Sequence, residues 1–337
     1  MRICIYGGGN LGHVVAGFIA AKSNLEVVLL TRHPEKWSKQ LLIDCPDGQL
    51  RGTLYGIYGR AEQAVSQADV VLLCLPGFSI REGLQQIKPF LPHQTAVGSV
   101  VSSTGFFFAA QEILSPTTPL FGFQRVPFIS RIVEYGHRAR LMGYKNSLKM
   151  AVEHSDNPKK LCLLFEQLLA TPVALLHSHY EASLTNSNPL LHPARLYTLW
   201  KDWHEGISYD RNPLFYEEWT DEASQTLIDM DQEFFQLLNT LPISPGSIPP
   251  ILDYYESHDA PSLTHKLRSI EAFKGISSPM KGINGRYIPD FQSRYFTEDF
   301  PYGLAIIQKL LYEKRIPAPT INRVCQWGLE KIKSYNQ

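Results

Sequence analysis

The chain has 337 residues, with 32 basic and 32 acidic side chains, and its length favours two domains over one. The balanced charge provides no strong positive field, so nucleic acid is not an expected partner, and no apolar run reaches the roughly 18 residues that a membrane span needs. The five cysteines are scattered without metal-ligand spacing. We therefore expect a protein of the reducing cytoplasm with no bound metal.

The first predicted elements are a strand, a glycine turn, a helix and a second strand. Residues 2–6 form a short apolar run, and residues 25–30 form another that is rich in β-branched side chains. Between them, an apolar helical face follows a G-x-G-x-x-G turn, whose backbone N–H groups can hold a pyrophosphate. The whole βαβ unit predicts dinucleotide binding by the turn residues Gly7, Gly9, Asn10, Leu11 and Gly12.

Two other interpretations of this segment are a glycine turn without a ligand and a signal peptide. Residues 11–21 are fairly apolar, but Arg2 is the only basic residue before them and three glycines interrupt the run. The signal-peptide interpretation is therefore set aside.

The end of the second predicted strand indicates which dinucleotide binds. In place of an acidic residue that would bond a ribose 2′-hydroxyl, the chain has Thr31 and Arg32, with Lys36 close behind. Arg32 can bind a 2′-phosphate with its fork of donors. The pattern favours NADP(H) over NAD(H), and the alternative is a solvated basic loop.

Strand-like and helical runs alternate up to about residue 180. The later strand-like runs are 69–77, 95–101, 119–123, 138–145 and 147–152. This alternation predicts a Rossmann doubly wound α/β sheet with added strands in a domain over residues 1–182. The loop after the 69–77 run should lie at the cofactor edge of the sheet, so Leu75 and Pro76 are further cofactor-binding candidates.

Residues 183–337 are predicted to form a mainly α-helical domain. Leucines and other apolar residues from Leu227 to Leu241 make a stripe at helical spacing, and the Pro- and Gly-rich segment 242–250 is predicted to be a loop. A dinucleotide-binding fold does not define its own substrate, so we expect this domain to supply the chemistry.

One candidate for chemistry is the segment 185–195. Pro193 suits the first turn of a helix, which would place His192 at the positive end of the helix dipole. That position opposes protonation, so a useful catalytic histidine there would need a neighbouring carboxylate. The alternative is a histidine that only caps the helix or packs in the interior.

A second candidate is the segment 293–304, which leads into another amphipathic helix. Asp299 has the identity and position of an N-cap, with Pro301 just inside the helix, so capping alone would explain it. Arg294 could simply form a surface ion pair. The same two residue types can also orient a catalytic histidine and bind a carboxylate.

The glycine turn, residues 123–136, residues 188–193 and residues 294–304 together resemble the octopine/nopaline (opine) dehydrogenase family, in the family's order and over nearly the whole chain. Members of that family have a Rossmann domain and a helical domain, and they reductively condense a 2-oxo acid with the amine of an amino acid, using a nicotinamide cofactor. The resemblance implies that His192 is the catalytic histidine, Asp299 its carboxylate partner and Arg294 a substrate-binding arginine.

Two other function classes stay open at this point. One is a ketopantoate reductase or β-hydroxyacid dehydrogenase, which would begin with the same turn but generally depends on a lysine in the second domain; residues 180–200 show no such lysine motif. The other is a dinucleotide-sensing protein without catalysis. The sequence leaves open the particular oxo acid and amine, the product stereochemistry, and whether the protein forms a homodimer.

Overall fold

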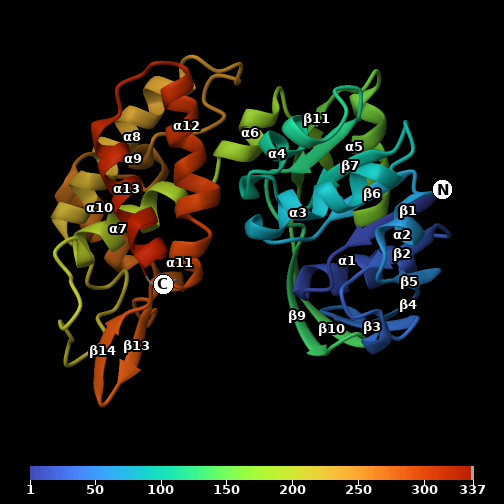
Figure 1. Cartoon of the computed structure of the whole chain (residues 1–337), viewed down its shortest axis with the longest axis horizontal. Coiled ribbons are helices and arrows are strands. Elements are labelled where there is room, and N and C mark those ends of the chain that lie inside the picture. The colour runs from blue at the N-terminus through green and yellow to red at the C-terminus, as the bar shows by residue number, and fades with distance from the viewer. Residues whose placement is uncertain (335–337) are drawn as a thin grey trace. The chain divides into compact units, whose positions relative to one another are not determined.

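The computed structural model describes residues 1–334, and these form two compact units, which meet in the chain between Thr185 and Asn186 (Figure 1). The boundary predicted between residues 182 and 183 falls inside helix α6 (His179–Leu184). The last residues of the predicted 183–337 domain, 335–337, lie outside the described range.

The first unit is built on an eight-stranded sheet. Its strand order is β12 (Val173–Leu175), β11 (Leu148–Glu153), β8 (Leu120–Phe123), β7 (Ala96–Ser99), β6 (Val70–Leu73), β1 (Arg2–Tyr6), β2 (Glu26–Leu30) and β5 (Gly56–Tyr58). Neighbouring strands are parallel except β8 and β11. Because β1 pairs with both β2 and β6, the order reverses next to β1, which is where doubly wound sheets bind ligands. The predicted doubly wound sheet with added strands is confirmed.

Helices cover both faces of this sheet, because successive apolar side chains along each strand point to opposite faces and both sets must be buried. Ile3 and Ile5 join a buried cluster with α1 (Asn10–Lys22) and α5 (Pro158–Leu169). Cys4 points to the opposite face and joins a cluster with α2 (Ala61–Val65), α3 (Gly77–Ile87) and α4 (Phe106–Ile113). Both faces of the central strands are buried, which accounts for their continuous apolar sequences.

A second, four-stranded sheet in the first unit was not predicted as such. Its order is β4 (Gly48–Thr53), β3 (Gln40–Cys45), β10 (Arg138–Tyr144) and β9 (Phe128–Glu134), and only β10 lies in a predicted run. These strands expose one face to solvent, so their apolar residues alternate with polar ones instead of forming continuous runs.

The second unit is mainly helical, as predicted (Figure 1). Its helices are α7 (Asn188–Trp200), α8 (Asp221–Leu238), α9 (Ile251–Tyr254), α10 (Ala260–Ser269), α11 (Arg294–Thr297), the π-turn η5 (Phe300–Leu304), α12 (Ala305–Glu313) and α13 (Pro319–Ser334). Helix α8 carries the predicted apolar stripe but ends before Leu241. A hairpin of β13 (Met280–Ile283) and β14 (Arg286–Pro289) was missed, although its turn residues Asn284 and Gly285, at φ 49° and 77°, are a recognised hairpin signal.

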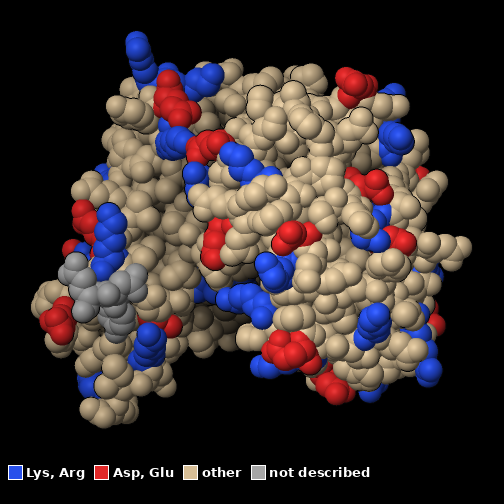
Figure 2. All heavy atoms as spheres, turned by 45° about the vertical axis from the view of Figure 1, so that its right-hand side comes forward, with Lys and Arg blue, Asp and Glu red and all other residues tan. Residues whose placement is uncertain are grey.

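Acidic and basic side chains are interspersed over the face drawn in Figure 2, in keeping with the balanced composition. Among the helices described in residues 1–334, none combines the length and the apolar character required to cross a membrane.

Candidate active site

The turn between β1 and α1 is shaped by glycines that no other residue could replace. Gly7 has φ 125° and donates its N–H to the carbonyl of Leu30 at 3.0 Å. A Cβ at Gly12 would lie 1.8 Å from the carbonyl oxygen of Gly7, and a Cβ at Gly7 would lie 2.6 Å from that of Cys74. The turn therefore requires glycine at both positions.

Gly9 differs from these two glycines, since the space around it is open. Apart from the adjoining backbone, no atom of residues 1–334 lies within 4 Å of the position that a Cβ at Gly9 would take. Gly9 is also the N-cap of α1, and within the described chain no side chain caps this helix and its first turn holds no acidic residue. The free N–H groups and the positive end of the dipole thus face open space, as a pyrophosphate requires.

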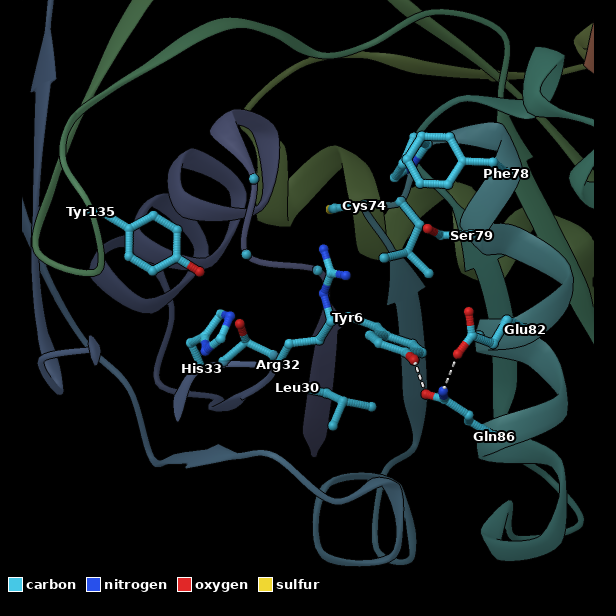
Figure 3. A pocket seen from close by; sticks show the side chains of 17 residues that line it. Tyr6, Leu30, Arg32, His33, Cys74, Phe78, Ser79, Glu82, Gln86 and Tyr135 are labelled. Atoms are coloured by element: carbon cyan, nitrogen blue, oxygen red, sulfur yellow. Dashed lines mark hydrogen bonds between the residues drawn. The ribbon is translucent and has the colours of Figure 1, made fainter. Parts of the chain in front are cut away.

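A pocket lies beside this turn, between the ends of β1, β2 and β6 and one face of α3 (Figure 3). Six of the predicted cofactor-binding residues line it: Gly7, Gly9, Thr31, Arg32, Leu75 and Pro76. The side chain of Arg32, at the end of β2, points into the pocket (Figure 3). The site thus brings together the glycine turn, the basic residue after β2 and the loop after β6.

The other four predicted cofactor-binding residues are not part of this lining. Gly12 is buried under the turn, Leu11 packs against the apolar core, and Lys36 is exposed in the short 3-10 helix η1 (Pro34–Lys36). The side chain of Asn10 accepts a hydrogen bond from the N–H of Ile132 in β9 at 2.7 Å. Their roles in cofactor binding stay predictions.

Helix α3 contributes pocket residues that the sequence analysis missed. The Tyr6 hydroxyl donates to Oε1 of Gln86, and Nε2 of Gln86 donates to Glu82 at 2.9 Å (Figure 3). Burial, with a smaller effect from Glu82, raises the pKa of Tyr6 to about 12, so the phenol stays a donor. The signal was available, because Ser79, Glu82 and Gln86 recur at helical spacing after the βα loop.

His13 joins the glycine turn to the hairpin of β9 and β10. Its Nε2 accepts the N–H of Gly136 at 2.7 Å, so its proton is on Nδ1, which lies 2.9 Å from the carbonyl oxygen of Gly9 and donates to it. Burial lowers the pKa of His13, which favours this neutral form. The contact brings Tyr135, the neighbour of Gly136, into the pocket lining.

In the second unit, His192 lies in the second turn of α7, which corrects the sequence prediction. The helix begins at Asn188 with Pro189 in its first turn, and Pro193 lies inside it. A proline inside the helix leaves the carbonyl four residues earlier without its usual donor, but it does not end this helix. The dipole acts mainly over the first turn, so the expected dipole effect on His192 does not apply.

Asp299 meets His192 and does not act as a cap. It precedes η5 as the sequence suggested, with Pro301 inside the turn, but its carboxylate makes no capping bond to residues 300–304. Oδ2 of Asp299 lies 2.7 Å from Nδ1 of His192, and both side chains are largely buried. A carboxylate there fixes the Nδ1–H tautomer of the ring.

The second nitrogen of His192 is bonded to a residue that the sequence analysis missed. Nε2 lies 2.9 Å from the hydroxyl of Tyr216, which follows no motif in the sequence. The ring of Tyr295 also packs against His192, with centroids 4.6 Å apart. His192 is therefore held on both nitrogens and on one face.

Arg294 lies at the start of α11, close to this cluster but directed elsewhere. Its guanidinium pairs with Glu298 through Nε and Nη2, each at 3.1 Å, and its side chain is 83% exposed. The hydrogen bond to Glu298 is the largest cause of a raised Arg294 pKa, and Asp299 adds to it. The structure thus brings His192 and Asp299 into contact and places Arg294 near them, facing solvent.

With this geometry in view, residues 175–331 match the family model of the NAD/NADP octopine/nopaline dehydrogenase α-helical domain, and residues 3–118 match that of ketopantoate reductase. The octopine dehydrogenase of Mizuhopecten yessoensis is 27% identical, over 98% of this chain and 90% of that protein. The helical part of the chain thus matches the octopine/nopaline dehydrogenase family, and the chain is similar to octopine dehydrogenases over nearly its whole length. It is an opine dehydrogenase-like, NAD(P)H-dependent oxidoreductase.

Further opine dehydrogenases are similar to this chain over nearly its whole length. The tauropine dehydrogenase of Arabella iricolor is 26% identical over 97% of this chain and 90% of its own. A solved octopine dehydrogenase with NADH and L-arginine superposes with a TM-score of 0.86 at 25% identity, over 99% of this chain and 90% of that one. A ketopantoate reductase reaches 0.65 at 14% identity, a likeness of fold alone. The ketopantoate reductase and sensor alternatives are therefore not favoured.

Proposed function

We propose that this opine dehydrogenase relative condenses a 2-oxo acid with the amino group of an amino acid, and that His192 is its general acid–base. The observation that carries the proposal is the buried contact of 2.7 Å between His192 and Asp299. Relatives give the substrate class, since octopine dehydrogenase has been solved with pyruvate, with L-arginine and with agmatine. The free thiols of all five cysteines, each within the described residues, support a cytoplasmic location.

We further propose NADPH as the preferred cofactor. The open space beside Gly9, the uncapped start of α1 and the pocket next to them fit a dinucleotide. Arg32 points into that pocket and would bond the 2′-phosphate through its guanidinium, whereas an acidic residue would repel it. When bound, the nicotinamide supplies the hydride that reduces the imine.

The acid–base steps need one group that takes a proton and later returns it. The ammonium of the amino acid must lose a proton before its nitrogen attacks the oxo acid, and the carbinolamine must gain one at its hydroxyl before water leaves. A neutral imidazole with its Nδ1–H on Asp299 can accept a proton and return it. Both steps thus fall to His192.

Arg294 would bind a substrate carboxylate in this scheme. Its guanidinium is exposed and already holds the two oxygens of Glu298 in a fork, which is the geometry that a carboxylate substrate would use. Substrate binding would therefore exchange one carboxylate partner for another. We assign Arg294 an orienting role and no proton transfer.

The test is oxidation of NADPH, and of NADH in parallel, with pyruvate, 2-oxoglutarate and glyoxylate against a panel of amino acids. We expect turnover that requires both an oxo acid and an amine and that is faster with NADPH. Turnover with an oxo acid alone would instead indicate a carbonyl reductase. Faster turnover with NADH would refute the cofactor preference while leaving the condensation in place.

A further inference from the structure

Both ring nitrogens of His192 are hydrogen-bonded, so neither offers a free lone pair to a substrate. Nδ1 lies against the Asp299 carboxylate at 2.7 Å, and Nε2 lies against the Tyr216 hydroxyl at 2.9 Å. Because a carboxylate can only accept, Nδ1 carries the proton of the neutral ring. The lone pair is then on Nε2, and the phenol of Tyr216 donates to it.

The phenol is held firmly in this position. Tyr216 is 5% exposed, its ring stacks on Phe273 with centroids 4.0 Å apart at 17°, and Trp219 lies nearly parallel at 6.1 Å. Burial raises the pKa of Tyr216, and the nearby Tyr295, Tyr255 and Asp299 raise it further. The hydroxyl therefore keeps its proton at neutral pH.

The segment that carries Tyr216 is anchored to the helix that carries His192. Arg195, one turn after His192 in α7, donates to the carbonyl of Phe215 at 3.1 Å and to that of Glu218 at 2.6 Å. Arg195 is 2% exposed, and desolvation lowers its pKa to about 10, so it is a strongly desolvated side chain that holds two backbone carbonyls. The Glu218 carboxylate also pairs with Arg211 and accepts the N–H of Leu214 at 2.8 Å. The His192 to Tyr216 spacing is thus set by several hydrogen bonds, of which that from Arg195 to the Phe215 carbonyl is buried.

We propose that Tyr216 is a further catalytic residue, a proton relay between His192 and the substrate. The inference rests on the proposed function of His192. In the base step, the phenol oxygen takes a proton from the substrate ammonium while its own O–H proton passes to Nε2. In the acid step, Nε2–H returns a proton to the phenol, which gives its own to the departing hydroxyl as water. The phenol is unchanged after each step, and one proton moves each way.

The direct experiment compares Tyr216→Phe with wild type in steady-state turnover of NADPH, oxo acid and amino acid. The change removes one hydroxyl and keeps the packed ring. We expect kcat to fall about 100-fold, the low end of general acid–base effects, with little change in either KM or in NADPH binding. Tyr197→Phe is the matched control, since Tyr197 lies on α7 together with His192 and packs on Trp327 with ring centroids 5.4 Å apart. We expect that control to keep wild-type kcat.

A second variant separates a relay from a purely structural role. Replacing Tyr216 with 3-fluorotyrosine keeps the hydroxyl and the fold while making the phenol more acidic, so a relay should shift the pH profile of kcat. A kcat for Tyr216→Phe within two-fold of wild type, or above it, overturns the relay, as does an unshifted profile for the fluorinated protein. His192→Ala tests the proposed function separately: if that variant keeps activity the proposed function fails, whereas an inactive His192→Ala beside a normal Tyr216→Phe removes only the relay.

Discussion

Nδ1 of His192 and Oδ2 of Asp299 lie 2.7 Å apart although 107 residues separate them in the chain. Helix α7 supplies the first residue, and the short turn between α11 and η5 supplies the second. The Asp299 carboxylate makes no capping bond to η5. It bonds to the imidazole of His192 instead. The pair therefore has a specific tautomer that a substitution can reverse.

Asp299→Asn should lower kcat by about 10²–10³. The amide can donate to Nδ1, which would move the ring proton to Nε2 and remove the lone pair that the base step needs. Cofactor binding, followed by NADPH fluorescence titration, should stay unchanged. Asp221→Asn, an exposed change at the start of α8, serves as the control. A variant with more than half of wild-type kcat would show that the carboxylate is not needed.

Arg32→Ser should raise the KM for NADPH by about 10–100-fold and leave that for NADH within about three-fold. The lost interaction is a hydrogen bond between charged groups, worth about 1.5–3 kcal/mol. Lys36→Ser removes a charge from the same loop without touching the pocket lining, so its effect should be smaller. Equal losses for both cofactors would show that Arg32 does not bind the 2′-phosphate.

Gly9→Ala and Gly12→Ala should have different effects despite the same chemical change. At Gly9 the added methyl enters open space, so the variant should fold normally and lose affinity for the dinucleotide. At Gly12 it would lie 1.8 Å from the carbonyl oxygen of Gly7, so the turn must shift and thermal stability should fall. Melting curves with and without NADPH distinguish the two, and a Gly9→Ala protein with wild-type affinity would contradict a pyrophosphate at the turn.

Asp231→Asn should stabilise the protein at neutral pH. Burial raises the pKa of Asp231 from 3.8 to about 6, although its carboxylate accepts the N–H of Ile251 at 3.0 Å. The folded state then binds this proton more tightly than the unfolded state, so stability falls as pH rises from about 4 to about 6 and is lowest, in this contribution, above 6. An asparagine keeps an acceptor without the charge.

The measurement is urea unfolding of both proteins at pH 4.5 and pH 7.5. We expect Asp231→Asn to be about 1–3 kcal/mol more stable at the higher pH, with a clearly smaller difference at the lower one, where only part of the contribution of Asp231 has been lost. Asp229→Asn, two residues earlier and less buried, controls for charge removal from α8. A difference between wild type and variant that is the same at both pH values would rule out titration of Asp231 as the cause.

The sequence predicted those elements of the fold that are buried most completely, such as the strands with both faces covered by helices. The strand at residues 2–6 and the helix after Gly9 appear where the apolar pattern put them, because continuous runs and helical spacing are direct signatures of burial. The strands β3, β4 and β9 lack such runs, since one face of their sheet meets solvent. Pro193 misled the prediction of the α7 start because Pro189 already fills the favoured first-turn position.

Some residues of the candidate site could be recognised from local sequence patterns, and others only from contacts between distant parts of the chain. Gly7, Gly9 and Arg32 could be found from local order along the chain, and they line the pocket. The meeting of His192 with Asp299 was implied by family resemblance and not by any spacing. Tyr216 had no signal, because its importance comes from tertiary contacts with α7 that no pattern around residue 216 records.

The dinucleotide pocket draws all its residues from the first unit, whereas His192, Asp299 and Tyr216 all belong to the second. Under the proposed function, we expect substitutions around Arg32 to change the preference between NADPH and NADH without affecting the residues proposed to transfer protons. Likewise, we expect changes in residues 186–334 to alter the choice of amine without changing the glycine turn. We therefore expect related enzymes to change their cofactor preference and their amine substrate independently, by mutations in different parts of the gene.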